Sequence, residues 1–518
     1  MISGVPQFKI TLGELLPDIS LNPAIQNIEV KSVSLDSRSV DSSGLFIALS
    51  GNKTHGRKYI HDAIEKGAAA ILCENESFSL DYVNGKPVIG ITALQQKVGS
   101  IAARFYHDPS GRIQVIGITG TNGKSTCVSL IAQIFNQLNI RAGIIGTLGY
   151  GLIDQKLNET GLTTPDAITC QKILHEMAHN KVEVVAMEVS SHAIAQNRIE
   201  GIKFYSAVFT NLSRDHLDYH SSFDEYGETK ARLFENSYLS YCVINADDDF
   251  GVSLLNSKMP EAAEIIRVSS VKSDVEVYAK SYTLDDGGIV ANIVTPWGEN
   301  TITSSLIGEF NLSNLLISIA AVCSAGAKFE KVIDTVPALH AVEGRMEKVK
   351  LDSEIDKQNE QETEINDISV FIDYAHTPDA LERALKCLSA YTANNLWVVF
   401  GCGGDRDKGK RSEMGAIAEK LADKIVITSD NPRSEDPAQI IRDIEAGMAN
   451  GNHITIISRH AAIHFALDNA KPGDCILIAG KGHEKYQIIN GEKLHFDDYQ
   501  IAKAAMNDRD RNVSRELK

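Results

Sequence analysis

One stretch constrains the chain more than any other: residues 113–126, with the sequence IQVIGITGTNGKST. An apolar run typical of a strand ends in a glycine turn, and Lys124-Ser125-Thr126 begin a helical pattern. Glycines let backbone N–H groups approach phosphate oxygens, a helix N-terminus adds positive charge, and a lysine and a hydroxyl can reach the outer phosphates and Mg²⁺. The spacing departs from G-x-x-x-x-G-K-[ST], but strand, turn, lysine and helix occur together. The segment therefore predicts a nucleotide-binding loop.

Length and charge limit the class of protein. The chain has 518 residues, which favours about three domains. A formal net charge of −17 argues against a nucleic-acid partner and against an anionic membrane surface. The eight cysteines are scattered without metal-binding spacing, which is typical of reduced thiols. With no leader-like start and no membrane-length apolar stretch, we expect a soluble, cytoplasmic protein without membrane insertion.

Residues 1–105 predict a small N-terminal α/β domain. Short strand signals precede residues 59–74, YIHDAIEKGAAAILCE, which resemble a helix. The loop 51–58, GNKTHGRK, is polar and cationic, and such a loop is by itself a solvated connection.

Residues 106–340 predict a central domain with a doubly wound parallel sheet, because the apolar strands VIGIT, VEVVAMEVS, YSAVFTNLS and YCVINADDD alternate with helical segments. Ligands collect at the carboxyl ends of such strands. Polar clusters follow there: Glu188, Ser190 and His192 after the second strand, residues 211–220 after the third, and Asn245, Asp247 and Asp248 after the fourth.

These polar residues also have ordinary structural interpretations. Glu188 alone would be a buried, paired carboxylate, His216 a helix cap, and Lys230 an exposed surface lysine. Beside a phosphate loop on the same sheet edge, however, a carboxylate and an imidazole suit a divalent cation that offsets phosphate charge.

The end of the central domain combines three further patterns. Residues 275–307 indicate antiparallel strands. Asn311 and Asn314 enter an apolar helix, either as N-caps or as side chains that bind the nucleotide. A hinge is predicted near Ala341, and the acidic tract 351–367 predicts an exposed loop insertion.

Residues 341–518 predict a C-terminal Rossmann-like α/β domain. Its strands end in the polar or glycine-rich clusters 373–376, 401–411, 430–433 and 480–484. Four clusters at one sheet edge indicate a ligand cleft, which we expect to face the phosphate loop across the hinge.

Together these segments resemble a known family. In chain order, GITGTNGKST, LTTPDA, MEVSSHA, NLSRDHLDYH, GEFNLSN, EGRMEKV, DYAHTPD, FGCGGDRDKGKR, SDNPRSEDP and GKGHE are similar to the Mur ligases, which build the stem peptide of peptidoglycan. The branch that adds meso-diaminopimelate is the most similar. The resemblance implies that ATP phosphorylates the D-glutamate carboxylate of UDP-N-acetylmuramoyl-L-alanyl-D-glutamate, after which the amine of meso-diaminopimelate attacks the acyl phosphate. Such chemistry needs cations, Mg²⁺ and exclusion of water.

The resemblance also implies roles for particular residues. The ATP-binding set is Gly120, Thr121, Asn122, Gly123, Lys124, Ser125, Thr126, Asn311, Arg345 and Asp373. Lys124, Glu188, His216 and Lys230 are the implied catalytic residues, with Ser125, Glu188, His216 and a carbamylated Lys230 at magnesium. The UDP-muramoyl set is Leu35, Ser37, Asn52, Lys53, Thr54, Thr163, Thr164, Ser190, Gln196 and Arg198. The diaminopimelate set is Arg406, Asp430, Asn431, Pro432, Arg433, Gly480 and Glu484.

Arg433 is the most informative of these residues, because a guanidinium can bind a carboxylate bidentately and diaminopimelate has a distal carboxylate that lysine lacks. One position departs from the family pattern: Glu343 stands where a proline usually precedes Gly-Arg-Met-Glu, which puts the stiffness of the hinge in question. The alternatives are a lysine-adding homologue, a folylpolyglutamate synthetase and a non-catalytic nucleotide-binding relative. A monomer is expected.

Overall fold

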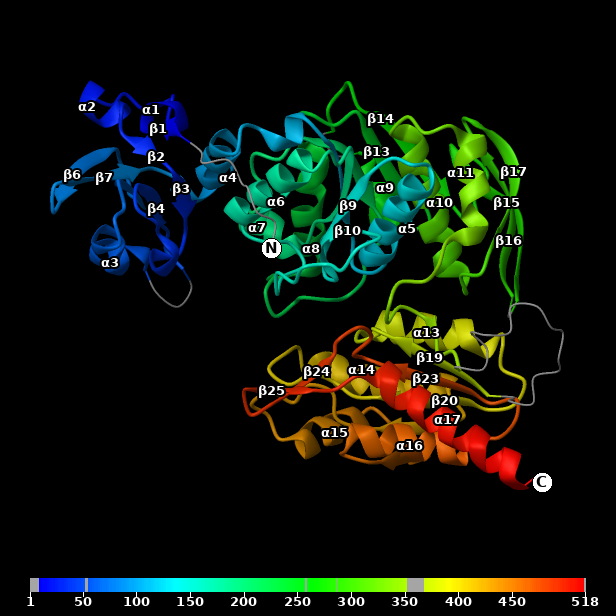
Figure 1. Cartoon of the computed structure of the whole chain (residues 1–518). Coiled ribbons are helices and arrows are strands. Elements are labelled where there is room, and N and C mark those ends of the chain that lie inside the picture. The colour runs from blue at the N-terminus through cyan, green and yellow to red at the C-terminus, as the bar shows by residue number, and fades with distance from the viewer. Residues whose placement is uncertain (1–8, 52–54, 257–258, 286, 352–367, 517–518) are drawn as a thin grey trace.

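The computed structural model describes residues 9–51, 55–256, 259–285, 287–351 and 368–516. Three α/β units follow one another along the chain (Figure 1). The first unit, in blue, lies beside one end of the green central unit, and the C-terminal unit, in yellow to red, lies below the central unit in this view. The predicted α/β class with parallel-rich sheets is confirmed. The limits at residues 105 and 340 stay predictions.

The N-terminal unit is built on a five-stranded sheet of order β3-β4-β5-β7-β6, in which only β6 is antiparallel. Alternate residues of β4 and β5 enter two cores on opposite faces of the sheet. The strands are β1 Ile10–Thr11, β2 Glu29–Val30, β3 Ser32–Ser34, β4 Gly44–Ala48, β5 Ala70–Glu74, β6 Ser79–Val83 and β7 Lys86–Ile91, and the α-helices are α1 Leu12–Leu15, α2 Pro23–Gln26, α3 Ile60–Glu65 and α4 Leu94–Phe105.

The helix expected over residues 59–74 is wrong in its second half. Helix α3 ends at Glu65, Gly67 follows with φ +101°, and residues 70–74 form the buried strand β5. A left-handed glycine ends a helix readily, because it has no Cβ to clash. The run AAAILCE then follows the strand preference of its apolar residues between two neighbouring strands.

The central sheet has ten strands in the order β10-β9-β11-β8-β12-β13-β14-β15-β16-β17. Its strands from β9 to β15 run parallel, and the predicted antiparallel extension is confirmed in β15, β16 and β17. The bounds are β8 Gln114–Thr119, β9 Ala142–Gly146, β10 Gly149–Leu152, β11 Val184–Glu188, β12 Phe204–Phe209, β13 Tyr241–Asn245, β14 Glu264–Ser269, β15 Val277–Asp285, β16 Gly288–Thr295 and β17 Gly298–Ser304.

Successive side chains of each parallel strand point to opposite faces of the sheet, and each face packs against its own hydrophobic core. Ile116 and Ile118 of β8 point into one core with helices α5 and α10, whereas Val115 points into the other with α6 and α8. A sheet buried on both faces explains why these strands are nearly continuous apolar runs. The α-helices are α5 Lys124–Gln137, α6 Ala167–His179, α7 Ser191–Ala195, α8 Phe223–Ala231, α9 Asp249–Leu254, α10 Glu309–Ser324 and α11 Phe329–Thr335.

The C-terminal unit has a six-stranded sheet of order β18-β19-β23-β20-β21-β22, parallel except for β18, and a separate hairpin of β24 and β25. The strands are β18 Glu347–Lys348, β19 Ser369–Asp373, β20 Leu396–Phe400, β21 Lys424–Ile427, β22 His453–Thr455, β23 Cys475–Ala479, β24 Tyr486–Ile489 and β25 Glu492–His495. The helices are α13 Pro378–Ser389, α14 Gly409–Leu421, α15 Pro437–Glu445, α16 Arg459–Asn469 and α17 Asp498–Glu516.

The structure bears on two expectations near the hinge, one about the acidic tract and one about the asparagines of α10. The acidic tract lies outside the described residues except for Leu351, which is buried in the C-terminal core rather than exposed. Asn311 and Asn314 are not N-caps, because Gly308 occupies that position and both asparagines are buried inside α10. No helix among the described residues has the length and hydropathy to cross a membrane.

Candidate functional site

The phosphate loop lies where β8 ends and α5 begins. Gly120 has φ +146°, and a Cβ there would lie 2.0 Å from Thr210 Oγ1. Gly123, with φ +84°, is the N-cap of α5, and a Cβ on it would lie 2.6 Å from Asn314 Oδ1. Both positions therefore require glycine, and the backbone N–H groups at the start of α5 are left facing the space beside the loop.

Two lysines meet at one carbonyl oxygen of this loop. Lys124 Nζ donates to the carbonyls of Gly120 (2.9 Å) and Thr121 (2.7 Å), and Lys230 Nζ donates to the same Gly120 oxygen (2.8 Å). Burial lowers the pKa of Lys124, and burial together with the charge of Lys124 lowers the pKa of Lys230 well below its usual value. In the described part of the chain neither lysine forms a salt bridge, so no carboxylate of the protein pairs with either amine.

The surface position expected for Lys230 from its residue type alone is wrong, because the side chain is only 1% exposed. Helix α8 places Lys230 Nζ 4.4 Å from the centroid of the Tyr226 ring. The Tyr226 hydroxyl lies 3.1 Å from Thr121 Oγ1, and Thr121 Oγ1 also bonds with Ser213. Tyr226 thus connects the helix that bears Lys230 to the phosphate loop.

Glu188 lies at the end of β11, next to the start of the phosphate loop. Its side chain is 1% exposed and accepts hydrogen bonds from the backbone N–H (2.9 Å) and hydroxyl (3.1 Å) of Thr147. Thr147 Oγ1 also lies 3.0 Å from Thr163 Oγ1. Each carboxylate oxygen retains a further lone pair, so Glu188 remains able to bind a cation.

Five residues of the expected muramoyl-binding set lie close to Glu188 in one network. The Thr164 hydroxyl donates to the Glu188 carbonyl (2.9 Å), and its oxygen lies 3.3 Å from Ser190 Oγ. Arg198 donates to the Thr164 carbonyl and, through Nε and Nη2, to the Gln196 side chain. Thr163, Thr164, Ser190, Gln196 and Arg198 therefore form a single polar surface beside β11.

His216 lies in a left-handed conformation, φ +56°, in the loop after β12. Its Nε2 lies 3.4 Å from Asp215 Oδ2, and its ring centroid lies 4.7 Å from that of His192. Burial lowers the pKa of both histidines to about 4, so they are neutral at pH 7. His216 does not cap a helix, because Ser222 caps α8. Among the described residues no three His, Cys, Asp or Glu side chains are grouped as a metal site.

A cleft with about 740 Å³ of empty space lies between the central and C-terminal units, next to the phosphate loop. Arg345 reaches it from the hinge, with Nη2 3.4 Å from Ser125 Oγ and its guanidinium 4.3 Å from the Tyr374 ring centroid. Asp373 lies half-buried in the wall, where desolvation raises its pKa, and it accepts hydrogen bonds from the backbone of Met346 and Ala375. The cleft is lined by Asn122, Gly123, Thr126, Asn311 and Asn314 from the central unit and by Arg345, Asp373, Tyr374, Ala380 and Arg383 from the other side.

A second pocket of about 1110 Å³ lies between the His216 loop and the C-terminal sheet edge. It brings together six residues of the diaminopimelate set with three histidines. Those residues are Arg406, Asp430, Asn431, Arg433, Gly480 and Glu484, joined by His192, His216 and His376. The predicted cleft facing the phosphate loop therefore corresponds to two adjoining openings.

A side-chain network fixes the base of this second pocket. Buried Lys481 donates to Asn431 Oδ1 (3.2 Å) and Glu484 Oε2 (3.2 Å), and Asn431 Nδ2 donates to the same Glu484 oxygen (2.8 Å). Gly480 is required beside Asp430, because a Cβ at φ +114° would lie 2.8 Å from Asp430 Oδ2. Arg433 has φ +53°, and its Nη1 donates to the Gly404 carbonyl (2.7 Å).

The structure leaves part of the expected muramoyl set apart. Leu35 and Ser37 lie after β3 in the N-terminal unit, and among the described residues no hydrogen bond joins them to the network around Thr164. Asn52, Lys53 and Thr54 lie outside the described residues. The N-terminal unit does contact the central unit closely at Gly99 of α4, where a Cβ would lie 1.9 Å from the Glu200 carbonyl oxygen.

Several residues at this pocket received no role from the sequence, among them Asp215, Tyr374 and His376 in its lining and Lys481 at its base. Each of these four lies inside a segment that was recognised, within NLSRDH, DYAHTPD or GKGHE. Their place directly after a strand was the available signal, because side chains there face the carboxyl edge of the sheet.

Three family models match consecutive parts of the chain. They are the Mur ligase family catalytic domain over residues 29–106, the Mur ligase middle domain over 118–322 and the Mur ligase glutamate ligase domain over 359–482. The chain belongs to the Mur ligase family. Residues 120–126 of the phosphate loop lie within the middle-domain match, whereas the second pocket is lined by residues of both the middle-domain and the glutamate ligase matches, with Glu484 just beyond the latter.

Curated relatives within this family carry a more specific name. The chain is 42% identical over 499 residues to the UDP-N-acetylmuramoyl-L-alanyl-D-glutamate–2,6-diaminopimelate ligase of Coxiella burnetii, covering 96% of this chain and 99% of that protein. It is 41% identical to the enzyme of the same name from Pseudomonas aeruginosa, over 96% and 98% of the two chains. A solved structure of a ligase with this name is 34% identical, with a TM-score of 0.70 and coverage of 97% and 99%.

Proposed function

We propose that this protein is the ATP-dependent ligase that joins meso-diaminopimelate to the D-glutamate of UDP-N-acetylmuramoyl-L-alanyl-D-glutamate in peptidoglycan precursor synthesis. Relatives of about 40% identity over nearly the whole chain have this activity in their names. The single observation that supports it most is the position of Arg433, in the same pocket as Asp430 and Glu484 and next to the nucleotide cleft. A guanidinium beside carboxylates suits an acceptor with both carboxylate and ammonium groups.

The reaction has two steps. In the first, a D-glutamate carboxylate oxygen attacks the γ-phosphorus of ATP, an O–P bond forms, and ADP leaves. In the second, the amine attacks the acyl carbon, the C–N bond forms, and the C–O bond to phosphate breaks while the amine loses a proton. The acyl phosphate makes phosphate the leaving group in place of a poor oxide.

The residues of the phosphate loop would serve the first step. Lys124 lies beside the Gly120 carbonyl, where its positive charge would offset the charge that develops on the transferring phosphoryl group. Arg345, 3.4 Å from Ser125 Oγ, would bind the nucleotide from the hinge side. The half-buried position of Lys124 strengthens its interaction with phosphate, because water screens charge less in such a site.

Magnesium and the state of Lys230 belong to the proposal. The oxygens of Ser125 and Glu188 suit Mg²⁺, and His216 and a carbamylated Lys230 complete the set that the family resemblance implies. When bound, the ion would neutralise charge on the phosphates. Carbamylation, a monomeric state and a cytoplasmic location stay predictions.

The function is tested by phosphate release from ATP with the uridine-linked dipeptide, Mg²⁺ and bicarbonate, comparing meso-diaminopimelate with lysine. We expect turnover with diaminopimelate alone. Turnover with lysine and not diaminopimelate would identify the lysine-adding alternative, and ATP binding without turnover for either amine would favour a non-catalytic relative.

A further inference from the structure

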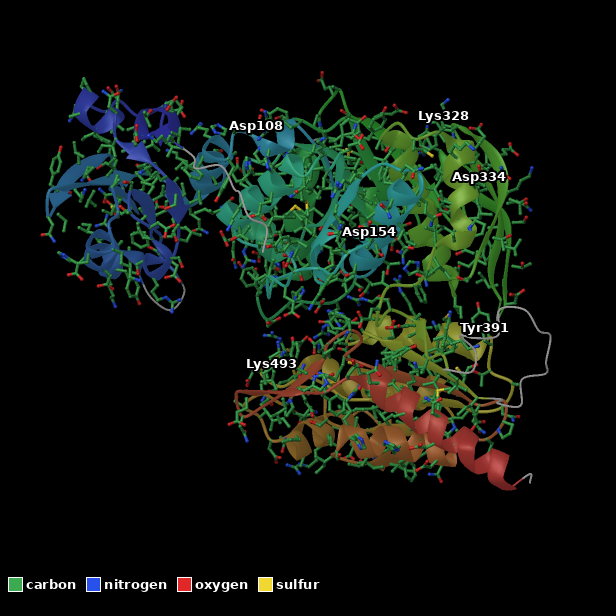
Figure 2. All side chains as sticks on the ribbon, viewed as in Figure 1. Asp108, Asp154, Lys328, Asp334, Tyr391 and Lys493 are labelled. Carbon is green, nitrogen blue, oxygen red and sulfur yellow. The ribbon has the colours of Figure 1, made fainter. Side chains whose placement is uncertain are left out.

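Tyr486 lines the second pocket, which is the acceptor pocket in the proposed function, and it has no role in the steps above. It is half-buried on strand β24 and lines the pocket together with Arg433 and Glu484. It belongs to the β24–β25 hairpin, in which Tyr486 pairs with His495. Figure 2 shows Lys493 on this hairpin, at one end of the C-terminal unit.

The hairpin fixes Tyr486 relative to the Asp430–Arg433 segment. Gln487 Nε2 donates to the Asp430 carbonyl (2.5 Å), and the Ile488 N–H donates to Asn431 Oδ1 (2.9 Å). The Arg433 N–H donates to the Ile488 carbonyl (2.9 Å), and the Asn490 N–H donates to the Arg433 carbonyl (2.7 Å). These bonds hold Arg433 in its left-handed conformation and leave the strand little freedom to move independently of it.

Two ammonium groups orient the aromatic ring. Lys493 Nζ lies 3.8 Å from the ring centroid and Lys481 Nζ lies 5.6 Å from it, both within the range of cation–π attraction. Lys481 also donates to Glu484, so the ring is tied to the network at the base of the pocket. Burial, followed by the charge of Glu484, raises the pKa of Tyr486, while Arg433 opposes the rise. The hydroxyl is therefore a neutral donor in the electrostatic field of both charged side chains.

This arrangement bears on the handedness of the acceptor. The distal carbon of diaminopimelate holds a carboxylate and an ammonium group, for which Arg433 and Glu484 are partners of opposite charge. With the rest of the acceptor held in place, inverting the configuration exchanges the positions of these two groups, so the pocket distinguishes the isomers only if Arg433 and Glu484 are themselves fixed. Tyr486 shares a hydrogen bond with Glu484, and its strand bonds with the Arg433 backbone. We propose that Tyr486 is the positioning residue that fixes these two side chains and thereby determines which configuration at the distal carbon is accepted. The inference rests on the proposed function, since it assumes a diaminopimelate acceptor.

The test compares meso-diaminopimelate with LL-diaminopimelate, which differs from it in configuration at one carbon, in the full-length protein and in Tyr486→Phe. We expect the wild type to favour the meso isomer in kcat/KM and Tyr486→Phe to reduce that preference by about tenfold, because one hydrogen bond to a charged or polar group is lost. The change should lie in KM for the meso isomer, with kcat and the KM for ATP nearly unchanged. Tyr82→Phe, on the exposed edge strand β6, is the matched control and should preserve the preference.

Three outcomes overturn the inference. Kinetic constants that fall equally for both isomers in Tyr486→Phe would make the tyrosine merely structural, as would an unchanged ratio. A wild type that uses both isomers equally would leave no discrimination to explain. A wild type inactive with meso-diaminopimelate would instead overturn the proposed function itself, so the two failures are distinguishable. Thermal unfolding of both variants checks that the fold is intact.

Discussion

The phosphate loop and the C-terminal unit, which is the acceptor domain in the proposed function, both hold buried or half-buried cations, but they pair them differently. Lys124, Lys230 and Arg345 meet carbonyl or hydroxyl oxygens. In the acceptor domain, Arg411 bonds with Glu435 and Asp443, and Arg459 with Asp498, whose side chain is also fully buried. The described residues include no salt bridge to any of the three cations near the phosphate loop.

This difference in pairing distinguishes two groups of cations. Those in salt bridges stabilise the fold, whereas those that contact only neutral oxygens are suited to bind an anionic ligand. Burying a charge raises the free energy of the folded protein unless the charge is paired. An anionic ligand is therefore stabilised most by a cation that contacts only neutral oxygens. Arg433 belongs to the second group although it lies in the acceptor domain, because its guanidinium donates to the Gly404 carbonyl. We therefore expect substitutions in the two groups to affect different quantities.

The largest effect is expected for Lys124→Met. Loss of this charge beside the phosphates should reduce the rate of phosphate release by roughly a thousandfold while the free energy of unfolding changes little, because the lysine pairs with no carboxylate. The matched control is Lys331→Met, whose exposed partner Asp334 lies on α11 at the outer side of the central unit (Figure 2). If Lys124→Met keeps the rate of phosphate release but lowers the free energy of unfolding, Lys124 stabilises the fold and the prediction is wrong.

Arg459→Met should have the opposite profile. It leaves Asp498 buried and unpaired and removes a donor to the Ala479 carbonyl, so the free energy of unfolding should fall by about 3 kcal/mol or more. Denaturant unfolding measures the change. The double variant Arg459→Met with Asp498→Leu should regain most of the loss, and a double variant no more stable than the single one would contradict the argument.

Arg433→Lys tests whether Arg433, although it lies in the acceptor domain, belongs to the cations that bind a ligand. The charge remains but the planar fork is lost, so kcat/KM for meso-diaminopimelate should fall by about a hundredfold with the KM for ATP nearly unchanged. Arg442→Lys, on the exposed side of α15, is the control. If ATP use and diaminopimelate use fall together, Arg433 supports the fold rather than the acceptor.

The smallest effect concerns pH. Burial, with help from Arg345, lowers the pKa of His483 from 6.5 to about 4. The unfolded chain therefore binds a proton between pH 6.5 and pH 4 that the folded chain does not, and stability falls as pH drops through this window. His483→Gln should make the decline shallower by about 1 kcal/mol in unfolding free energy. An identical decline in both proteins would show that other groups cause it.

The sequence predicted the sheets because their strands are buried on both faces and are therefore strongly apolar. It also located the site, since polar residues directly after parallel strands converge. It failed for the β5 run, where apolar residues fit a helix and a buried strand equally well, and only Gly67 marked the boundary.

Burial and pairing of charged groups were not predictable in the same way. Lys230 looks like any surface lysine until its contact with Gly120, 110 positions earlier in the chain, is known. Lys481 and Asn431 likewise meet only because β21 and β23 end at the same edge of their sheet. Such contacts depend on the tertiary fold, and no local periodicity encodes them.

Gly344 has a consequence for the timing of catalysis. With φ +67°, it lies so close to the Gly482–His483 backbone that a Cβ would be 2.1 Å from the His483 nitrogen. Arg345 follows immediately and extends to Ser125, so one short joint connects the Gly482–His483 backbone to the phosphate loop. If Arg345 binds ATP as proposed, a movement of that backbone would also move the arginine, and occupation of the second pocket would then influence hydrolysis of ATP before the amine reacts.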